Sequence, residues 1–327
     1  MRFLNTIVFW LKAARVHTLP MSFMSWLVVF CWAVVRGGNV FFGVLALIGV
    51  MFAHLGVNLI DDYFDFKREV GTIKSSEEKK SIKMQKGKCK YLIDGKATLN
   101  QALMVVFIYF GLASLIGLFL LIFCGWQVAL IAIIAAVFCL LYPYLTYWGL
   151  SEVAVGMTFA PLLFAGTSFV MLGYISRDIL LLSISTGLLT VGLLHTHALM
   201  DYDFDIEDKK KTLCTILGSK KASLIALGLM MAGAYVNIAV GVLLGMFPLA
   251  TILTFITIPL AVVLYKLMKL NIEHPEVVPE RKPWMGPMDN WEEIKVNNAQ
   301  SFMLRFYISR NIMMFFTILL CIGILLG

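Results

Sequence analysis

The sequence predicts an all-α membrane protein that crosses the bilayer about nine times. Hydrophobic residues make up 60% of the 327 residues, charged residues make up 14%, and the mean hydropathy is +0.86. Soluble domains are roughly half apolar and a quarter charged, so this chain has too few charges for a surface covered by water. The apolar residues also gather into blocks of about 20, the length that spans a bilayer as a helix.

About nine such blocks follow one another along the chain, and together they predict one transmembrane domain over residues 1–327. The six cysteines are scattered without a CxxC pair, which predicts packing rather than a disulfide framework or a zinc site. The blocks fall near residues 18–36, 40–60, 101–123, 126–146, 153–174, 178–200, 222–244, 247–269 and 303–326.

The basic residues predict the orientation of the helices. If the N-terminus is cytoplasmic, the inner segments are 1–17, 61–100, 147–152, 201–221 and roughly 266–310, and only Arg36 and Arg177 of the 27 Lys and Arg residues lie outside them. Because cytoplasmic loops carry an excess of Lys and Arg, we expect the N-terminus inside and the C-terminus outside a plasma or inner membrane. Basic loops between apolar blocks favour anionic lipid and substrate over nucleic acid as partners. The expected cytoplasmic loops are 61–100, 201–221 and 271–300.

An acidic cluster closes the second apolar block, which ends in NLIDDYFDFKRE. If the helix continues, Asp61, Asp65 and Glu69 lie on one face at i, i+4 and i+8. Asn58 and Asp62 form an adjacent i, i+4 pair on the same helix.

A second acidic cluster closes the sixth block, which ends in HALMDYDFDIED. On a continuous helix, His197, Asp201, Asp205 and Asp208 share one face. Each half of the chain therefore has an apolar span that ends in carboxylates and is followed by lysines, which is a weak internal repeat.

The two clusters predict a magnesium site. Like charges at i, i+4 repel each other, and carboxylates near hydrocarbon cost free energy. Magnesium removes both costs, since it binds carboxylates and completes its shell with water and phosphate oxygens. A single acidic cluster at a helix end is most simply the polar boundary of a span, but two in matching places favour metal and diphosphate. Lys90, Lys210 and Lys211 are placed to hold further diphosphate oxygens.

At these residues the chain resembles the UbiA superfamily of intramembrane aromatic prenyltransferases. It is most similar to the branch that acts on 1,4-dihydroxy-2-naphthoate in menaquinone biosynthesis. The resemblance departs at Asp61, where the family usually has Asn, at Glu69, where it has Asp, and at Trp148, where relatives often have Arg. Four segments carry the resemblance, namely RVHTLP at 15–20, DDYFD at 61–65, GLSEV at 149–153 with FAP at 159–161, and DYDFD at 201–205 with Lys210, TL at 212–213 and LG at 217–218.

The resemblance implies a helical bundle around a central cavity that the two acidic loops cap. We expect Mg²⁺ as the cofactor, and polyprenyl diphosphate and a small, aromatic acceptor as substrates. The catalytic residues implied are Asp61, Asp65, Asp201 and Asp205. The metal ligands expected are Asp61, Asp62, Asp65, Glu69, Asp201 and Asp205, and the substrate-binding residues expected are Asn58, Arg15, Arg68, Lys90, Lys210 and His197.

Two roles stay open at this point. Arg15 either reaches the diphosphate or anchors the inner membrane interface. His195 and His197 lie near the inner end of the sixth block, where one could take a proton from the acceptor, although a packed and hydrogen-bonded histidine is the simpler interpretation.

The reaction expected is magnesium-dependent transfer of a polyprenyl group to an aromatic acceptor in quinone biosynthesis. One alternative is a member of the same superfamily with a non-quinone acceptor, such as a lipid, haem or chlorophyll precursor. A transporter with duplicated halves is a further alternative, but it predicts acidic residues deep within spans. Here the acids lie at the inner ends of spans beside lysines.

Overall fold

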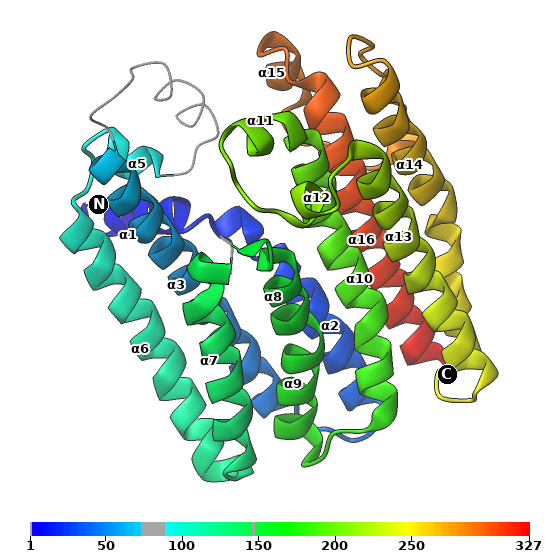
Figure 1. The fold of residues 1–327 in the computed structure, drawn as a ribbon. Helices are drawn as coiled ribbons and strands as arrows, with labels where there is room; N and C mark the ends of the chain where they lie inside the picture. Colours follow the sequence, from blue (N-terminus) through cyan, green and yellow to red (C-terminus); the bar gives the residue numbers. More distant parts are fainter. Residues whose placement is uncertain (1, 73–88, 146–147) are drawn as a thin grey trace. The chain divides into compact units, whose positions relative to one another are not determined.

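The computed structural model describes residues 2–72, 89–145 and 148–327. Within these ranges the chain is helical and contains no strand (Figure 1). Eight helical segments of the described chain are long and apolar enough to cross a membrane, and Gln127–Tyr142 is a shorter apolar helix. The predicted all-α class is therefore confirmed, and the expected number of about nine spans fits approximately.

The chain divides into two compact units, and the first comprises Met1–Phe23 and Phe41–Pro143. Its buried core lies where α3 meets α5 and α6, and it includes Leu55, Leu59, Leu92 and Val106. The helices of this unit are α1 (Arg2–Ala13), η1 (Val16–Thr18), α3 (Val40–Thr72), α5 (Lys90–Ile93), α6 (Leu99–Cys124) and α7 (Gln127–Leu145).

The start of α6 follows from local sequence. The Thr98 hydroxyl accepts the Gln101 amide at 3.2 Å, and the Gln101 side chain accepts the Thr98 amide at 2.9 Å. This reciprocal capping box satisfies two backbone donors that a helix start otherwise leaves unpaired.

The second unit comprises Met24–Val40 and Tyr144–Gly327. Within it, α11, α12 and α15 lie at the end of the bundle opposite the C-terminus (Figure 1). Its helices are α2 (Pro20–Val34), α8 (Ser151–Met157), η3 (Thr158–Leu162), α9 (Leu163–Leu172), α10 (Arg177–Met200), α11 (Tyr202–Glu207), α12 (Leu213–Ile216), α13 (Lys220–Leu243), η4 (Leu249–Thr257), α14 (Ile258–Glu273), η5 (Pro283–Met285), α15 (Trp291–Val296) and α16 (Gln300–Leu326).

Helix α10 is the centre of the second unit and packs against α13 and α16. Polar side chains join α10 to α13, because the Ser185 hydroxyl donates to the Ala234 carbonyl at 2.9 Å and the Asn237 amide donates to the Leu181 carbonyl at 2.8 Å. Buried polar groups in a membrane protein need such partners, since lipid offers none.

Two spans of the second unit differ from the uninterrupted α-helices that hydropathy predicts, because the span over 249–273 begins as the 3-10 helix η4 and the span over 151–172 contains a π-helical turn. The span over 151–172 is made of α8, η3 and α9, and Pro161 lies inside the π-helical turn η3. Proline lacks a backbone donor, which explains the interruption. The sixth span ends at Met200, and Asp201 joins it to α11 with φ −92° and ψ 7°.

Residues 274–299 form η5, α15 and their connections, and the N-terminal half of α16 holds this segment. The Asn311 amide donates to the carbonyls of Met285 and Pro287 at 2.9 and 3.1 Å. The Tyr307 hydroxyl donates to the Asp289 carbonyl at 3.0 Å. The long proline-containing loop is thus attached to a transmembrane helix.

Candidate functional site

The first aspartate motif lies at the end of the apolar part of α3, and Arg15 forms ion pairs with two of its carboxylates. The Arg15 guanidinium donates to Asp62 at 3.0 Å, to Asp61 at 3.3 Å and to the Asn58 carbonyl at 2.8 Å. The Asp62 side chain is only 2% exposed and that of Asp61 10%. Two roles were open for Arg15, diphosphate binding or anchoring at the membrane interface. In this structure its guanidinium contacts the aspartate motif.

The charge of Arg15 suits this position. Burial of its guanidinium lowers the pKa of Arg15, but the Asp62 and Asp61 carboxylates outweigh that effect and the net shift is upward. Arg15 therefore stays charged, and it faces two carboxylates in a partly buried environment.

A hydrogen-bond network holds the backbone of Arg15 in place. Arg15 has a left-handed backbone with φ 57°. The Asn58 amide donates to the Ala14 carbonyl at 2.9 Å and to the Thr18 hydroxyl at 3.0 Å. His54 lies 3.2 Å from that hydroxyl and 2.8 Å from the hydroxyl of Ser22. Asn58, expected to bind substrate, thus contacts the chain around Arg15 in this structure.

The rest of the first motif continues along α3. Asp65 is half-buried one turn beyond Asp61, and the helix extends to Thr72 as the spacing predicts. The side chains of Arg68 and Glu69 lie outside the described residues. The Cys89 thiol donates to the Asp62 carbonyl at 3.4 Å, which brings the start of α5, and with it the exposed Lys90, next to the motif.

The second motif surrounds the joint between α10 and α11. The backbone bonds from Asp201 to His197 and from Asp205 to Asp201, at 3.1 and 2.9 Å, persist through the joint. The i, i+4 spacing of the motif is therefore kept although the helix is not continuous. Asp205 is buried, and Lys210 donates to its carboxylate at 3.2 Å, while Asp201 is half-buried.

A groove of about 410 Å³ opens beside Asp205. The three lysines at 209–211 outnumber the single carboxylate of Asp205, so the lining of the groove has a net positive charge. Trp148 adds an exposed aromatic wall, since its side chain is 67% exposed. We call this the lysine groove, and it is lined by Trp148, Asp205, Ile206, Lys209, Lys210, Lys211, Thr215 and Ile216.

The two histidines of α10 differ in their surroundings. His195 is fully buried, and its ring lies 2.8 Å from the Ser223 carbonyl and 3.4 Å from the Cys214 thiol. Burial raises the pKa of Cys214 to about 12, so this thiol stays protonated. The His197 ring stacks on Phe306 and lies tilted against Phe302, at centroid distances of 4.8 and 5.1 Å. The packing interpretation fits both histidines.

Glu152 is a buried carboxylate that sequence reasoning left without a role. It is 3% exposed, and it accepts the Leu213 amide at 3.2 Å and the Ser151 hydroxyl at 2.9 Å. The only signal in the sequence is its place in the GLSE segment, which predicts no contact with a residue 61 positions later.

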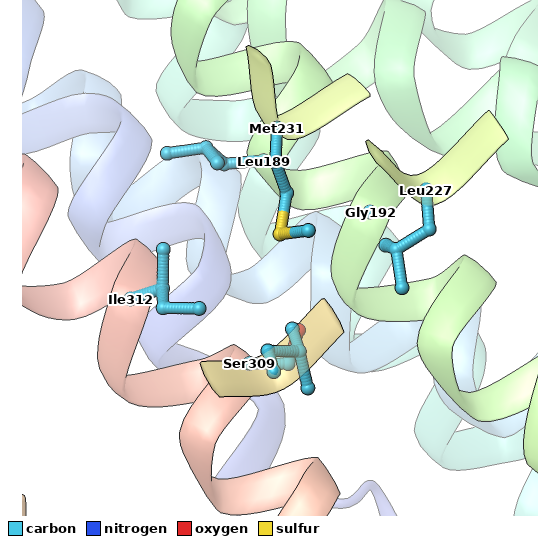
Figure 2. A pocket seen from close by; sticks show the side chains of 7 residues that line it. Leu189, Gly192, Leu227, Met231, Ser309 and Ile312 are labelled. Carbon is cyan, nitrogen blue, oxygen red and sulfur yellow. The ribbon is translucent and has the colours of Figure 1, made fainter. Parts of the chain in front are cut away.

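A second cavity, of about 10 Å³, lies inside the second unit between α10, α13, α14 and α16 (Figure 2). Leu189, Leu227 and Ile312 are among its largely apolar lining residues. Its volume corresponds to about one water molecule, so it is not a substrate site.

Comparison with known proteins identifies the class. The pattern of the UbiA prenyltransferase family matches residues 21–277. The chain is 29% identical over 227 residues to the 1,4-dihydroxy-2-naphthoate octaprenyltransferase of Haemophilus influenzae, a match that covers 65% of this chain and 70% of that protein.

Solved structures share the fold. A structure described for digeranylgeranylglyceryl phosphate synthase has a TM-score of 0.62 at 19% identity and covers 100% of both chains. A UbiA homologue from Archaeoglobus fulgidus bound to GPP and Mg²⁺ has a TM-score of 0.54 at 15% identity, covering 95% of this chain and 99% of that one. A UbiA homologue from Aeropyrum pernix K1 has a TM-score of 0.58 at 16% identity, covering 90% and 98%.

The chain belongs to the UbiA prenyltransferase family. It is a multi-pass integral membrane prenyltransferase, which confirms the expected class of enzyme and sets the transporter alternative aside.

We predict that Arg15→Met destabilises the protein, because it removes the guanidinium from two nearly buried carboxylates. Breaking one partner of a buried ion pair costs on the order of 3 kcal/mol. Thermal unfolding in detergent, followed by tryptophan fluorescence, should show a clearly lower Tm. Adding Asp62→Asn should recover part of the loss.

The matched control is Lys269→Met, which breaks the exposed pair between Lys269 and Glu273 on α14. Exposed pairs contribute roughly 0–1 kcal/mol, so the Tm should hardly change. An equal Tm for Arg15→Met and Lys269→Met would contradict the proposed electrostatic role of Arg15.

Proposed function

We propose that this chain transfers a polyprenyl group from polyprenyl diphosphate to an aromatic acceptor, with Mg²⁺ held by its two aspartate motifs. The observation that carries the proposal is that carboxylates follow the apolar part of α3 and the end of α10, and that each set contacts a cationic side chain, Arg15 in one and Lys210 in the other. Carboxylates that pair with the side chains of Arg15 and Lys210 can also bind a metal cation.

The donor chemistry fits magnesium. Mg²⁺ prefers hard oxygen ligands and binds one or two carboxylates together with substrate phosphates. Asp61, Asp65, Asp201 and Asp205 supply such oxygens, with Asp62 beside them and Glu69 as the last acidic residue of the first motif. Within the described residues, no three side chains of His, Cys, Asp or Glu are already gathered as a metal cage. Such a site is expected to be completed by the diphosphate oxygens. Bound magnesium would neutralise charge on the diphosphate as it leaves.

The basic residues are proposed to bind the diphosphate. Lys210 and its neighbours 209 and 211 line the lysine groove beside Asp205, and Lys90 is exposed next to the first motif. Ammonium groups form strong charge-assisted bonds with phosphate oxygens. Departure of diphosphate breaks the allylic C–O bond, an electron-rich ring carbon of the acceptor forms the new C–C bond, and the ring then loses a proton. The apolar spans would exclude water, which would otherwise consume the allylic cation.

The acceptor is proposed to be a dihydroxynaphthoate, as the name of the Haemophilus influenzae relative suggests. The corresponding pathway would be menaquinone biosynthesis. A non-quinone acceptor is the alternative. One structure with the same fold is described for digeranylgeranylglyceryl phosphate synthase, so glycerol phosphate lipids belong in the same test.

We predict that Asp65→Ala and Asp201→Ala each reduce prenyl transfer by roughly 100-fold or more, because each removes a metal-binding carboxylate. The assay follows a radiolabelled prenyl group in purified protein with magnesium or with EDTA, against aromatic and glycerol phosphate lipid acceptors. Asp178→Asn, at the other end of α10, is the control and should retain activity. Product that forms equally well in EDTA, or in both alanine variants, would reject the metal assignment.

We also propose that the two compact units act as one transmembrane domain with a cytoplasmic N-terminus in a plasma or inner membrane. The uneven distribution of Lys and Arg supports this orientation.

This orientation predicts the behaviour of reporter fusions in a bacterial host. Alkaline phosphatase fused after Gly327 should be active, since it folds only outside the cytoplasm, and a fluorescent protein at that site should be dark. Fusions after Gly218, in the second inner loop, should show the reverse. A fluorescent C-terminal fusion would contradict the topology.

A further inference from the structure

We propose that Glu152 is a positioning residue, whose carboxylate fixes α12 and thereby the turn that carries Lys210 to Asp205. This inference rests on the proposed function, in which Lys210 and Asp205 bind the diphosphate and its metal.

The contact of Glu152 with α12 is direct. Leu213 is the first residue of α12, and its backbone N–H has no acceptor within so short a helix. Glu152 provides that acceptor at 3.2 Å, from a side chain that is 3% exposed. The Ser151 hydroxyl donates to the other carboxylate oxygen at 2.9 Å and so helps to orient it.

A second contact supports the same attachment. Gly149 has a left-handed backbone with φ +69°. A Cβ at this position would collide with the Ile216 side chain and lie 3.4 Å from the Thr212 carbonyl oxygen. The segment that carries Glu152 therefore packs closely against both ends of α12.

Helix α12 is also held by α10 and α13. The Cys214 thiol lies against His195 of α10, and the Ser223 hydroxyl of α13 donates to the Cys214 carbonyl at 3.3 Å. Helix α12 thus contacts both the 149–152 segment and the α10–α13 pair, and we call this set of contacts the clamp.

Thr215 connects α12 to the proposed diphosphate-binding residue Lys210. Its hydroxyl donates to the Lys210 carbonyl at 3.2 Å. The Lys210 amide donates to the Asp205 carbonyl at 2.8 Å, and its ammonium group reaches the Asp205 carboxylate at 3.2 Å. A chain of short contacts therefore connects Glu152 to the Asp205–Lys210 pair.

The contacts of Glu152 indicate that it positions α12 rather than binding the metal or the diphosphate itself. A buried carboxylate is costly, and a glutamine could accept the same amide and exchange a hydrogen bond with Ser151. Geometry, rather than charge, is what the contacts use, so the isosteric amide should serve nearly as well.

The test compares Glu152→Ala, Glu152→Gln and Glu152→Asp in purified, folded protein. Glu152→Ala should raise the KM for prenyl diphosphate and the magnesium midpoint roughly 10- to 100-fold, the effect typical of lost support behind a metal-binding group, with a smaller change in kcat. Glu152→Gln should stay close to wild type. If the alanine variant does not fold, Glu152→Asp replaces it, since its shorter side chain should not reach Leu213 and should also raise KM.

The matched control is Asn311→Ala, which removes a buried side chain that holds the 283–289 segment by two hydrogen bonds. It should leave the KM for prenyl diphosphate and the magnesium midpoint unchanged. A general loss of packing would affect both variants alike.

Hydrogen–deuterium exchange separates this inference from the proposed reaction. Exchange over residues 208–217 should increase in Glu152→Ala and not in Asn311→Ala, whether or not an acceptor has been found. Unchanged exchange in that segment, an unchanged KM, or a glutamine variant as impaired as alanine would overturn the positioning role. Increased exchange in a protein without prenyl transfer would uphold the clamp and count against the function instead.

Discussion

The motif aspartates lie where the apolar part of α3 ends and where α10 ends, and an ionised carboxylate near hydrocarbon costs free energy unless cations or hydrogen-bond donors compensate it. Arg15 compensates Asp61 and Asp62, and Lys210 compensates Asp205. Each cation comes from a segment that must be held close to its motif. The Asn58 and His54 network holds the chain around Arg15, and α12 holds the turn that contains Lys210. Much of the structure near the motifs can be understood as support for these ion pairs.

Much of the fold could be predicted from hydropathy, because a span must be long and apolar to cross a bilayer. The interruptions could be foreseen less well. Pro161 signals a defect, but whether a π-turn or a kink follows depends on the neighbouring helices. The joint at Asp201 has no comparable signal in the sequence, since DYDFDIED continues the acidic spacing of the helix before it. Uniformly apolar spans also give little indication of which face packs inside.

In the candidate site too, some features could be predicted from the sequence and others could not. Carboxylate spacing along one helix is a local property, so the motif residues could be chosen from sequence. The partners of those residues come from distant segments: Arg15 lies 46 positions from Asp61, and Glu152 lies 61 from Leu213. A resemblance could suggest the GLSE segment, but only tertiary structure shows that its glutamate contacts α12. His195 illustrates the converse, since a histidine near a motif is a candidate base until its burial against Cys214 and Ser223 is seen.

The central claim is that the aspartate motifs are metal ligands when diphosphate is bound, and metal binding tests it most directly. Mn²⁺ would be titrated into purified protein and followed by electron paramagnetic resonance, with and without a non-reactive prenyl thiodiphosphate. We expect tight Mn²⁺ binding only when the analogue is present, with sites lost when either Asp65 or Asp201 is replaced by alanine. Analogue binding that is equally strong with EDTA, and unchanged in both variants, would contradict the account.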